Sequence, residues 1–351
     1  EPLPGAKCGV VASPETERFG PGFNAAMLRS GSAKGLAWWY NWQPGGVPRG
    51  FSLKDFGDVK LVPQFWGGKD VTFAPASTPA IPVVLGFNEP DQADMGGSSM
   101  TVEAGLKAWM RLTTKARQKG YTSFVGPSIA KALPEQYTGI SMVGESDWLP
   151  RFLEGCHTLA GCPETMTYLG FHMYEPRCDL SEAEVRQWDM NIRVGSLKRL
   201  MDDFNGKGFQ IRGLWLTEFA GRSDEGGDCR TLSQQRTWMA NIIPMLNAEP
   251  AVVAYSWFSY GQGRSPYFRD NANLWDYRTN QLNELGETYF RLCNHLPPHP
   301  VPSAPGGSPS SLRWLAAVAV AAGCAVLFLR PMRAGSASAR DALVTRGQGN
   351  Q

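Results

Sequence analysis

The sequence contains few histidines and little net charge. Only 4 histidines occur among 351 residues, and none stands in a metal-binding spacing such as HExxH. The formal net charge is +2, which gives no electrostatic reason to expect nucleic acid or an acidic partner. The N-x-S/T motif of N-glycosylation is also absent. We therefore expect a protein without a metal, without a cofactor and without a nucleic-acid partner.

Apolar and aromatic residues are abundant by comparison. Hydrophobic residues make up 42% of the chain, which is enough for one large domain or two ordinary ones. Several of the 12 tryptophans fall near the ends of predicted strands, where an aromatic ring suits either a core or a ligand site. For any single tryptophan both interpretations remain open.

Six of the 7 cysteines precede residue 300. Six cysteines allow fifteen disulfide connectivities, so the sequence leaves the pairing open, and six free buried thiols are the alternative. The pairs that we expect are Cys156–Cys162 within one loop, Cys178–Cys229 between two loops, and Cys8–Cys293 between the ends of the domain. Disulfides would indicate an oxidising compartment.

The composition changes twice near the C-terminus. Residues 297–311 are rich in Pro, Ser and Gly and are typical of a linker. Residues 314–329 are uninterrupted apolar sequence between Arg313 and Arg330, about 24 Å long as a helix. No polar stripe divides this run, which argues against an amphipathic helix, and a polar tail follows it, which argues against a lipid-anchor signal. We expect a transmembrane helix followed by an arginine-rich cytosolic tail.

The chain would then be a single-pass membrane protein of the secretory pathway or cell surface. Its folded part would be lumenal or extracellular, and a signal peptide would have been removed. The predicted segments are a folded domain over 1–296, a linker over 297–312, a membrane helix over 313–330 and a cytosolic tail over 331–351.

Eight short β-rich segments recur before residue 260. Most are apolar throughout, as strands covered on both faces are. They are residues 7–13, 35–42, 60–66, 81–88, 122–128, 167–174, 213–219 and 251–259. Stretches with helical spacing of apolar residues predict helices over 101–120, 181–208 and 233–247. Eight strands alternating with such connections predict a (β/α)8 barrel.

The ends of the predicted strands carry acids, amides and aromatic residues. In a barrel of this kind these ends meet at one face. Glu89 in "GFNEPD" ends the fourth strand and Glu218 in "WLTEFA" ends the seventh. Glycosidic bond cleavage needs such a pair, one carboxyl group to protonate the leaving oxygen and one to attack the anomeric carbon. Each motif is weak alone, and their joint placement carries the interpretation.

The motifs "YNW", "VPQFW", "GFNEPD", "GFHMY", "WLTEFA" and "AYSWFS", in this order, resemble glycoside hydrolase family 128, a (β/α)8 family of endo-β-1,3-glucanases. The resemblance covers roughly residues 7–293. It implies that Glu89 is the acid/base, that Glu218 is the nucleophile and that Asn88 binds the 2-hydroxyl of the reacting sugar. Tyr174 would orient Glu218. The remaining implied substrate-binding residues are Trp257, as the floor of the reacting subsite, and Tyr40, Asn41, Gln64, Trp66 and His172 along the groove.

The chain departs from the family pattern on the sixth strand. The family reads H-W-Y-G there, whereas this chain reads His172-Met173-Tyr174-Glu175-Pro176. The lost tryptophan and the added acid bear on the subsite preference. The sequence predicts a retaining endo-hydrolase of β-1,3-glucan. The alternatives are a hydrolase of β-mannan or mixed-linkage glucan, a non-catalytic glucan-binding surface protein, and a purely structural barrel.

Overall fold

The computed structural model divides into two compact units, Glu1–Pro300 and Val301–Gln351. All of the residues that it describes lie in the first unit. They are residues 7–12, 28–31, 34–44, 53–73, 81–93, 96–223, 227–259, 272–276, 278–279 and 281–294.

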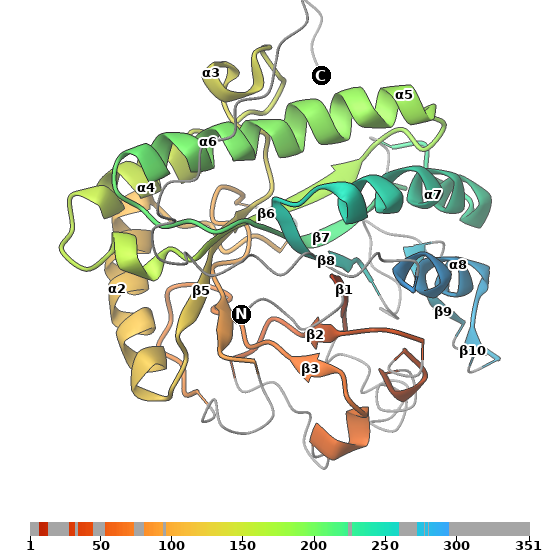
Figure 1. The fold of residues 1–351 in the computed structure, drawn as a ribbon, viewed down its shortest axis with the longest axis horizontal. Coiled ribbons are helices and arrows are strands. Elements are labelled where there is room, and N and C mark those ends of the chain that lie inside the picture. Colours follow the sequence, from red (N-terminus) through yellow and green to blue (C-terminus); the bar gives the residue numbers. More distant parts are fainter. Residues whose placement is uncertain are drawn as a thin grey trace, which may run out of the picture. The chain divides into compact units, whose positions relative to one another are not determined.

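Eight parallel strands form one sheet in the order β3-β2-β1-β8-β7-β6-β5-β4 (Figure 1). Their bounds are β1 Cys8–Val11, β2 Trp38–Tyr40, β3 Lys60–Leu61, β4 Val83–Leu85, β5 Ser123–Ile129, β6 Tyr168–Glu175, β7 Leu214–Gly221 and β8 Val252–Trp257. The segment after β3 also pairs with β4, because Gln64 bridges to Leu85 and the Phe65 amide donates to the Leu85 carbonyl at 2.9 Å. The eight predicted strands are confirmed, and the arrangement fits a (β/α)8 fold.

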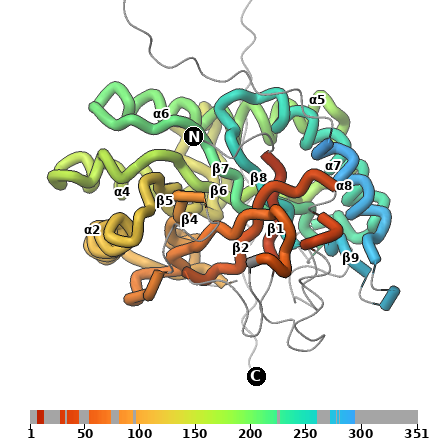
Figure 2. The backbone as a smooth tube through the Cα atoms, turned by 60° about the horizontal axis from the view of Figure 1, so that its bottom comes forward, coloured from red at the N-terminus to blue at the C-terminus, as the bar shows by residue number. Residues whose placement is uncertain are grey.

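Helices cover the outside of this sheet (Figures 1 and 2). Their bounds are η2 Leu53–Phe56, α2 Val102–Gln118, α3 Glu135–Thr138, α4 Trp148–His157, η3 Pro163–Thr165, α5 Glu182–Val185, η4 Arg186–Val194, α6 Gly195–Gly206, α7 Leu232–Ala248 and α8 Glu284–Cys293. A short antiparallel pair, β9 Trp275–Asp276 and β10 Gln281–Leu282, precedes α8. The three predicted helices correspond to α2, to α5–η4–α6 and to α7. The second of them contains a π-helical segment, η4, a geometry often found at functional sites.

Side chains at the helix starts explain where the helices begin. Thr101 accepts from the Ala104 amide at 3.2 Å and caps α2. Reciprocal capping boxes begin α5, with Ser181 and Glu184, and α7, with Thr231 and Gln234. These bonds satisfy amides that a helix start leaves without intrahelical partners.

Aromatic side chains fill much of the space between the strands. The Trp38 and Trp215 ring centroids lie 5.0 Å apart, and the Trp38 indole donates to the Lys7 carbonyl at 3.1 Å. Gly9 on β1 makes room for this indole, because a Cβ there would lie 2.2 Å from the Trp38 ring. The sheet therefore curls around a packed core rather than a pore.

The three expected disulfides are confirmed. They are Cys8–Cys293, Cys156–Cys162 and Cys178–Cys229. The first joins β1 to α8, with Cα atoms 5.9 Å apart and 285 residues between them in sequence. In the chain-entropy model, closing a loop of that length stabilises the folded state by about 6 kcal/mol.

The predicted localisation as a single-pass membrane protein is corrected. Among the residues that the structure describes, no helix is both long and apolar enough to cross a membrane. The predicted linker, the membrane helix over 313–330 and the tail after it lie outside the described residues.

Candidate active site

Glu89 and Glu218 meet at the carboxyl ends of the strands. Glu89 follows β4, where its amide donates to the Ser128 carbonyl of β5 at 2.8 Å. Glu218 lies on β7 directly opposite His172 on β6. Each glutamate is only 4% exposed. One oxygen of each and the His172 ring nitrogen all lie within 4.8 Å of one another, so the two acids face the same small volume.

The backbone is strained at two residues of this site. Three non-glycine residues of the described part have a positive φ, namely Trp42 at 59°, Glu89 at 44° and Ser99 at 45°. Bulky residues rarely adopt this left-handed region, and such strain is often kept where function needs a particular side-chain direction. At Glu89 the bond to Ser128 holds the strained turn in place.

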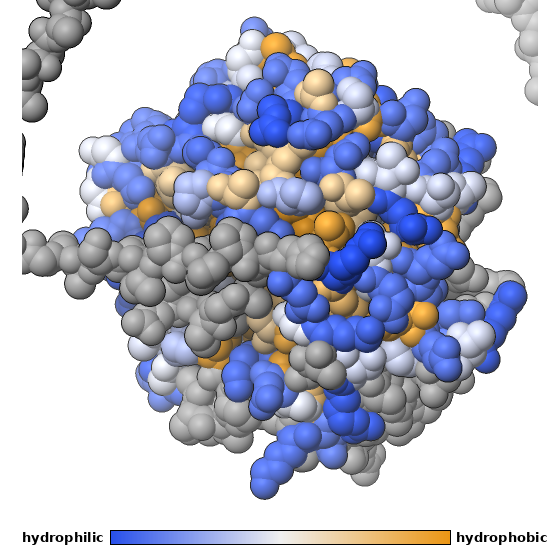
Figure 3. Space-filling view, turned by 45° about the vertical axis from the view of Figure 1, so that its right-hand side comes forward, coloured by the Kyte–Doolittle hydropathy of each residue, from blue (hydrophilic) through white to orange (hydrophobic). Residues whose placement is uncertain are grey.

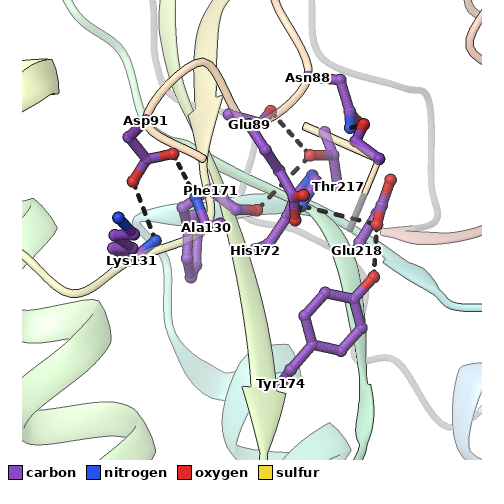
Figure 4. A network of polar contacts seen from close by, with 12 residues as sticks. Asn88, Glu89, Asp91, Ala130, Lys131, Phe171, His172, Tyr174, Thr217 and Glu218 are labelled. Carbon is purple, nitrogen blue, oxygen red and sulfur yellow. Dashed lines mark hydrogen bonds and ion pairs between the residues drawn. The ribbon is translucent and has the colours of Figure 1, made fainter. Parts of the chain in front are cut away.

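Three donors converge on the Glu218 carboxylate. Tyr40 and Trp42 donate to Oε1 at 2.9 and 2.8 Å, and the Tyr174 hydroxyl donates to Oε2 (Figure 4). Burial, together with the charge of Glu218, raises the pKa of the Tyr40 and Tyr174 hydroxyls well above the usual value. Both tyrosines therefore remain donors, and Glu218 is held as an acceptor, which suits a nucleophile.

Glu89 has a different set of neighbours. Its Oε1 lies 2.7 Å from His172 Nδ1, which is also 3.5 Å from Glu218 Oε2 (Figure 4). Burial raises the pKa of the Glu89 carboxyl, although the hydrogen bond from His172 opposes this. Burial lowers the pKa of His172, but the charges of Glu218 and Glu89 outweigh it and the net shift is upward. One carboxyl group thus retains its proton more readily than usual, as a general acid must.

The same three residues could in principle offer ligands to a metal ion. The atoms that would bind the metal ion already take part in hydrogen bonds, however. Glu218 accepts hydrogen bonds from three donors. His172 Nδ1 lies within hydrogen-bond distance of Glu89 Oε1. Acid–base chemistry accounts for this pattern of donors without a metal.

A cavity of about 620 Å³ opens above the two acids. On the face of the molecule that Figure 3 shows, hydrophobic residues form a band at the surface. Among the residues that line the cavity are Glu89, Glu218, Asn88, His172, Tyr174, Trp42, Trp66 and Phe258. Trp66 is 41% exposed, so its ring is available to a sugar face. Apolar walls with a few converging polar groups are typical of a ligand site.

The comparisons with known proteins agree with this geometry. The model of the family "Glycosyl hydrolase catalytic core" matches residues 22–289. The chain belongs to this glycosyl hydrolase family. The resemblance to glycoside hydrolase family 128 is confirmed as well, because solved structures of family 128 members match the chain at 19–25% identity.

Two of these structures illustrate the range of the glycosyl hydrolase relatives. One is a family 128 (subgroup I) endo-β-1,3-glucanase from Amycolatopsis mediterranei in complex with laminarihexaose, 24% identical, covering 82% of this chain and 99% of that chain, with a TM-score of 0.55. Another is a family 128 (subgroup VII) oligosaccharide-binding protein from Cryptococcus neoformans, 20% identical, covering 83% and 95%, with a TM-score of 0.51. At these identities the likeness concerns the fold.

A curated relative is the alkali-sensitive linkage protein 1 of Schizosaccharomyces pombe. It is 24% identical over 257 residues, which are 73% of this chain. The chain spans 40% of the length of that relative.

Four predicted substrate-binding residues do not line the cavity. They are Tyr40, Asn41, Gln64 and Trp257, all 0–2% exposed. Tyr40 instead donates a hydrogen bond to Glu218 Oε1. The Trp257 ring packs on the outer face of β8 against Phe219 and Trp238, and its indole donates to the Ala272 carbonyl at 2.8 Å. Trp257 therefore belongs to the core, and the prediction of a subsite floor there is corrected.

The other predicted residues lie together at the cavity. Asn88, Trp66, His172 and Tyr174 line it with both acids. Asn88 donates from its amide to the Gly96 carbonyl at 3.3 Å, while its Oδ1 is buried with no partner among the described residues. A buried acceptor without a partner, on a residue that lines a cavity, suits a sugar hydroxyl.

Sequence reasoning missed Phe258 and Arg193, which both line the cavity. Phe258 comes one residue after the predicted Trp257, so the error is a single step of side-chain alternation. Arg193 lies within the predicted helix over 181–208 and was not among the predicted site residues. The acid four residues before it, Asp189, was the available signal.

Asp189 itself is fully buried against Glu175. Its Oδ2 accepts from the Trp238 indole at 3.0 Å. Burial raises the pKa of the Asp189 carboxyl to about 7, against the opposing charge of Arg193, and the charge of Glu175 adds to the rise. Asp189 therefore exchanges its proton near neutral pH.

This shift predicts a pH-dependent stability. The folded state binds the Asp189 proton more tightly than the unfolded state, so the stabilisation is complete below pH 3.8 and is lost as the pH rises through about 7. Asp189→Asn resembles the protonated form. Relative to this variant, the free energy of unfolding of the wild type should fall by up to about 4 kcal/mol between pH 4 and pH 8.

Urea melts at several pH values measure that difference. The exposed acid Asp202 on α6 provides a matched control, and Asp202→Asn should follow the wild type at every pH. If the free energies of unfolding of the wild type and Asp189→Asn change with pH in parallel, the proton exchange at Asp189 is contradicted.

Proposed function

We propose that the chain is a retaining glycoside hydrolase that cleaves β-1,3-glucan internally. Glu89 protonates the leaving oxygen, and Glu218 attacks the anomeric carbon to form a glycosyl-enzyme intermediate. Glu89 then acts as the base that activates water for the second displacement. The observation that carries this proposal is the asymmetric pair, in which Glu89 has a raised pKa and Glu218 accepts from three donors.

The spacing of the carboxyl groups supports the retaining mechanism. Oxygens of the two acids lie within 4.8 Å of each other, whereas inverting enzymes hold their carboxyl groups about 6.5–9.5 Å apart to admit a water. The aromatic walls Trp42, Trp66 and Phe258 support a sugar substrate. The β-1,3 linkage and the endo mode are supported by the family 128 glucanase with its laminarihexaose.

A binding protein without turnover is the second candidate. The Cryptococcus neoformans relative, an oligosaccharide-binding protein, shares the fold. Both carboxyl groups and their donors are present in this chain, which favours turnover over binding alone.

The first test follows new reducing ends from linear β-1,3-glucan, β-mannan and mixed-linkage glucan, all treated with the full chain. We expect short oligosaccharides to be released from β-1,3-glucan. Proton NMR spectra should show the β-anomer of these products first. Release from one of the other polymers alone would change the substrate, and an initial α-anomer would contradict retention. Binding without release would establish the second candidate.

A further inference from the structure

Arg193 is an unusual member of the cavity wall because two buried acids hold it there. Glu175 ends β6 and is 1% exposed, and Asp189 lies on η4 and is fully buried. Glu175 Oε2 lies 3.6 Å from Arg193 Nη2, and Asp189 Oδ1 lies 3.7 Å from Arg193 Nη1. The guanidinium is therefore held between two acids that solvent does not reach, while its side chain keeps 24% exposure.

These contacts position the guanidinium without using up its donors. Both ion-pair distances exceed hydrogen-bond length, and the nearest acceptor is the Tyr174 carbonyl, 3.4 Å from Nη1. A guanidinium has five N–H groups in a rigid fork, so several remain for a ligand in the cavity. The nearby acids also offset its charge, Asp189 in its ionised form, which favours neutral hydroxyl groups over an anion.

Apolar side chains line the same cavity as Arg193. Leu133 and Met142 come from the segment after β5, and Leu197 comes from α6. The Tyr137 carbonyl accepts from Arg199 Nε, which ties α3 to α6. We call this part of the cavity, between the two joined elements, the lobe. Thr138, Ser196 and Arg193 line it as polar residues beside the apolar ones.

The chemistry of the proposed reaction indicates which part of the substrate lies in this lobe. Trp42, which donates to Glu218, and Phe258 mark the β2 and β8 side of the cavity, where the sugar under attack would lie. The acid protonates the oxygen of the departing sugar, so the departing part of the chain lies on the Glu89 side. Beyond Glu89 the cavity continues over the β5 end into the lobe.

Resting on the proposed function, we propose that Arg193 is a specificity residue of a leaving-group subsite. Its N–H groups bind hydroxyls of a neutral β-linked glucosyl unit on the reducing-end side of the cleaved bond. Leu133, Met142 and Leu197 contact the apolar face of that unit. The acid that departs from the family pattern on β6, Glu175, holds Arg193 in position.

Arg193→Lys is the main test, because it keeps a positive charge beside the buried acids but loses the fork. The substrate is laminarihexaose with an isotope label at its reducing end. We expect kcat/KM to fall about tenfold or more, mainly through KM, because a hydrogen bond to a charged group is lost. The label should move into shorter products, since fewer sugars are then held on the reducing-end side.

The matched control is Arg186→Lys, because Arg186 lies on the same π-helical segment but pairs with Glu182 at the surface. It should behave as the wild type. If Arg193→Lys also behaves as the wild type, or if the label moves into longer products, the assignment is overturned. Thermal melts show whether each variant is folded, and a folded variant with an unchanged product pattern counts against the subsite.

A failure of the proposed function is distinguishable from a failure of this assignment. If the wild type releases no products, calorimetric titration with the same hexaose replaces the kinetic readout. Weaker binding by Arg193→Lys than by Arg186→Lys then supports the subsite without turnover. Equal binding by both variants, or no binding by the wild type, overturns it.

Discussion

Glu218→Gln should lower the rate of β-1,3-glucan cleavage by about 10⁴-fold or more, the loss typical of an enzyme deprived of its nucleophile. The amide oxygen still accepts from Tyr40 and Trp42, which donate to Oε1 of the carboxylate. The shape of the site should therefore persist while the attack on the anomeric carbon is lost. The measurement is the initial rate of reducing-end release at saturating polymer.

A matched control and a direct trap accompany this experiment. Glu182→Gln removes an exposed carboxylate of α5 and should leave the rate unchanged. A 2-fluoro glycoside of a β-1,3-linked disaccharide should label the wild type covalently, and the labelled peptide should contain Glu218. A label on another residue, or a Glu218→Gln variant within tenfold of the wild type, would place the nucleophile elsewhere.

Glu89→Ala should have the second largest effect, lowering polymer cleavage by about 10²–10⁴-fold. An aryl glycoside whose leaving group needs no protonation should still form the intermediate in this variant. Its breakdown lacks the base, however, so azide should accelerate turnover and yield a β-glycosyl azide. The absence of rescue by azide would remove Glu89 from the role of acid/base.

The pH dependence of kcat/KM provides a further test of the role of Glu89. An acid is active while protonated, so kcat/KM of the wild type should fall as the pH rises through the pKa of Glu89, which burial raises. In Glu89→Ala this alkaline limb should disappear for the aryl glycoside. A limb that persists unchanged in the variant would belong to another group.

The strands and the acid pair were predictable because two simple regularities act together. Buried parallel strands are mostly apolar, so β4 and β7 can be recognised in the sequence as runs of mainly apolar residues. Barrel topology then brings their carboxyl ends to one face, and Glu89 and Glu218 meet as expected. Neither inference needs knowledge of a side-chain direction.

The direction of individual side chains was not predictable at the irregular strand ends. Pairing of β7 with β8 shifts register between Leu216 and Phe219, so a count by alternation fails just before the site. Trp257 consequently turns to the outer helices while Phe258 lines the cavity. An alternating pattern in sequence contains no mark of such a shift.

Arg193 was hidden for a different reason. A basic residue on an amphipathic helix is usually solvated, and only the fold reveals that Glu175 from a distant strand lies beside it. The pairing of Arg193 with Glu175 joins η4 to β6 through space, so the local spacing of Asp189 and Arg193 does not reveal it.

The bridge between Cys8 and Cys293 has a mechanical consequence. It joins β1 to α8, so tension applied between the chain before Cys8 and the chain after Cys293 passes through a covalent bond. The strands and helices between these residues would carry no load while the bridge is intact. A reducing agent would transfer the pull to β1 and α8, and single-molecule stretching should then show the barrel extending only after reduction.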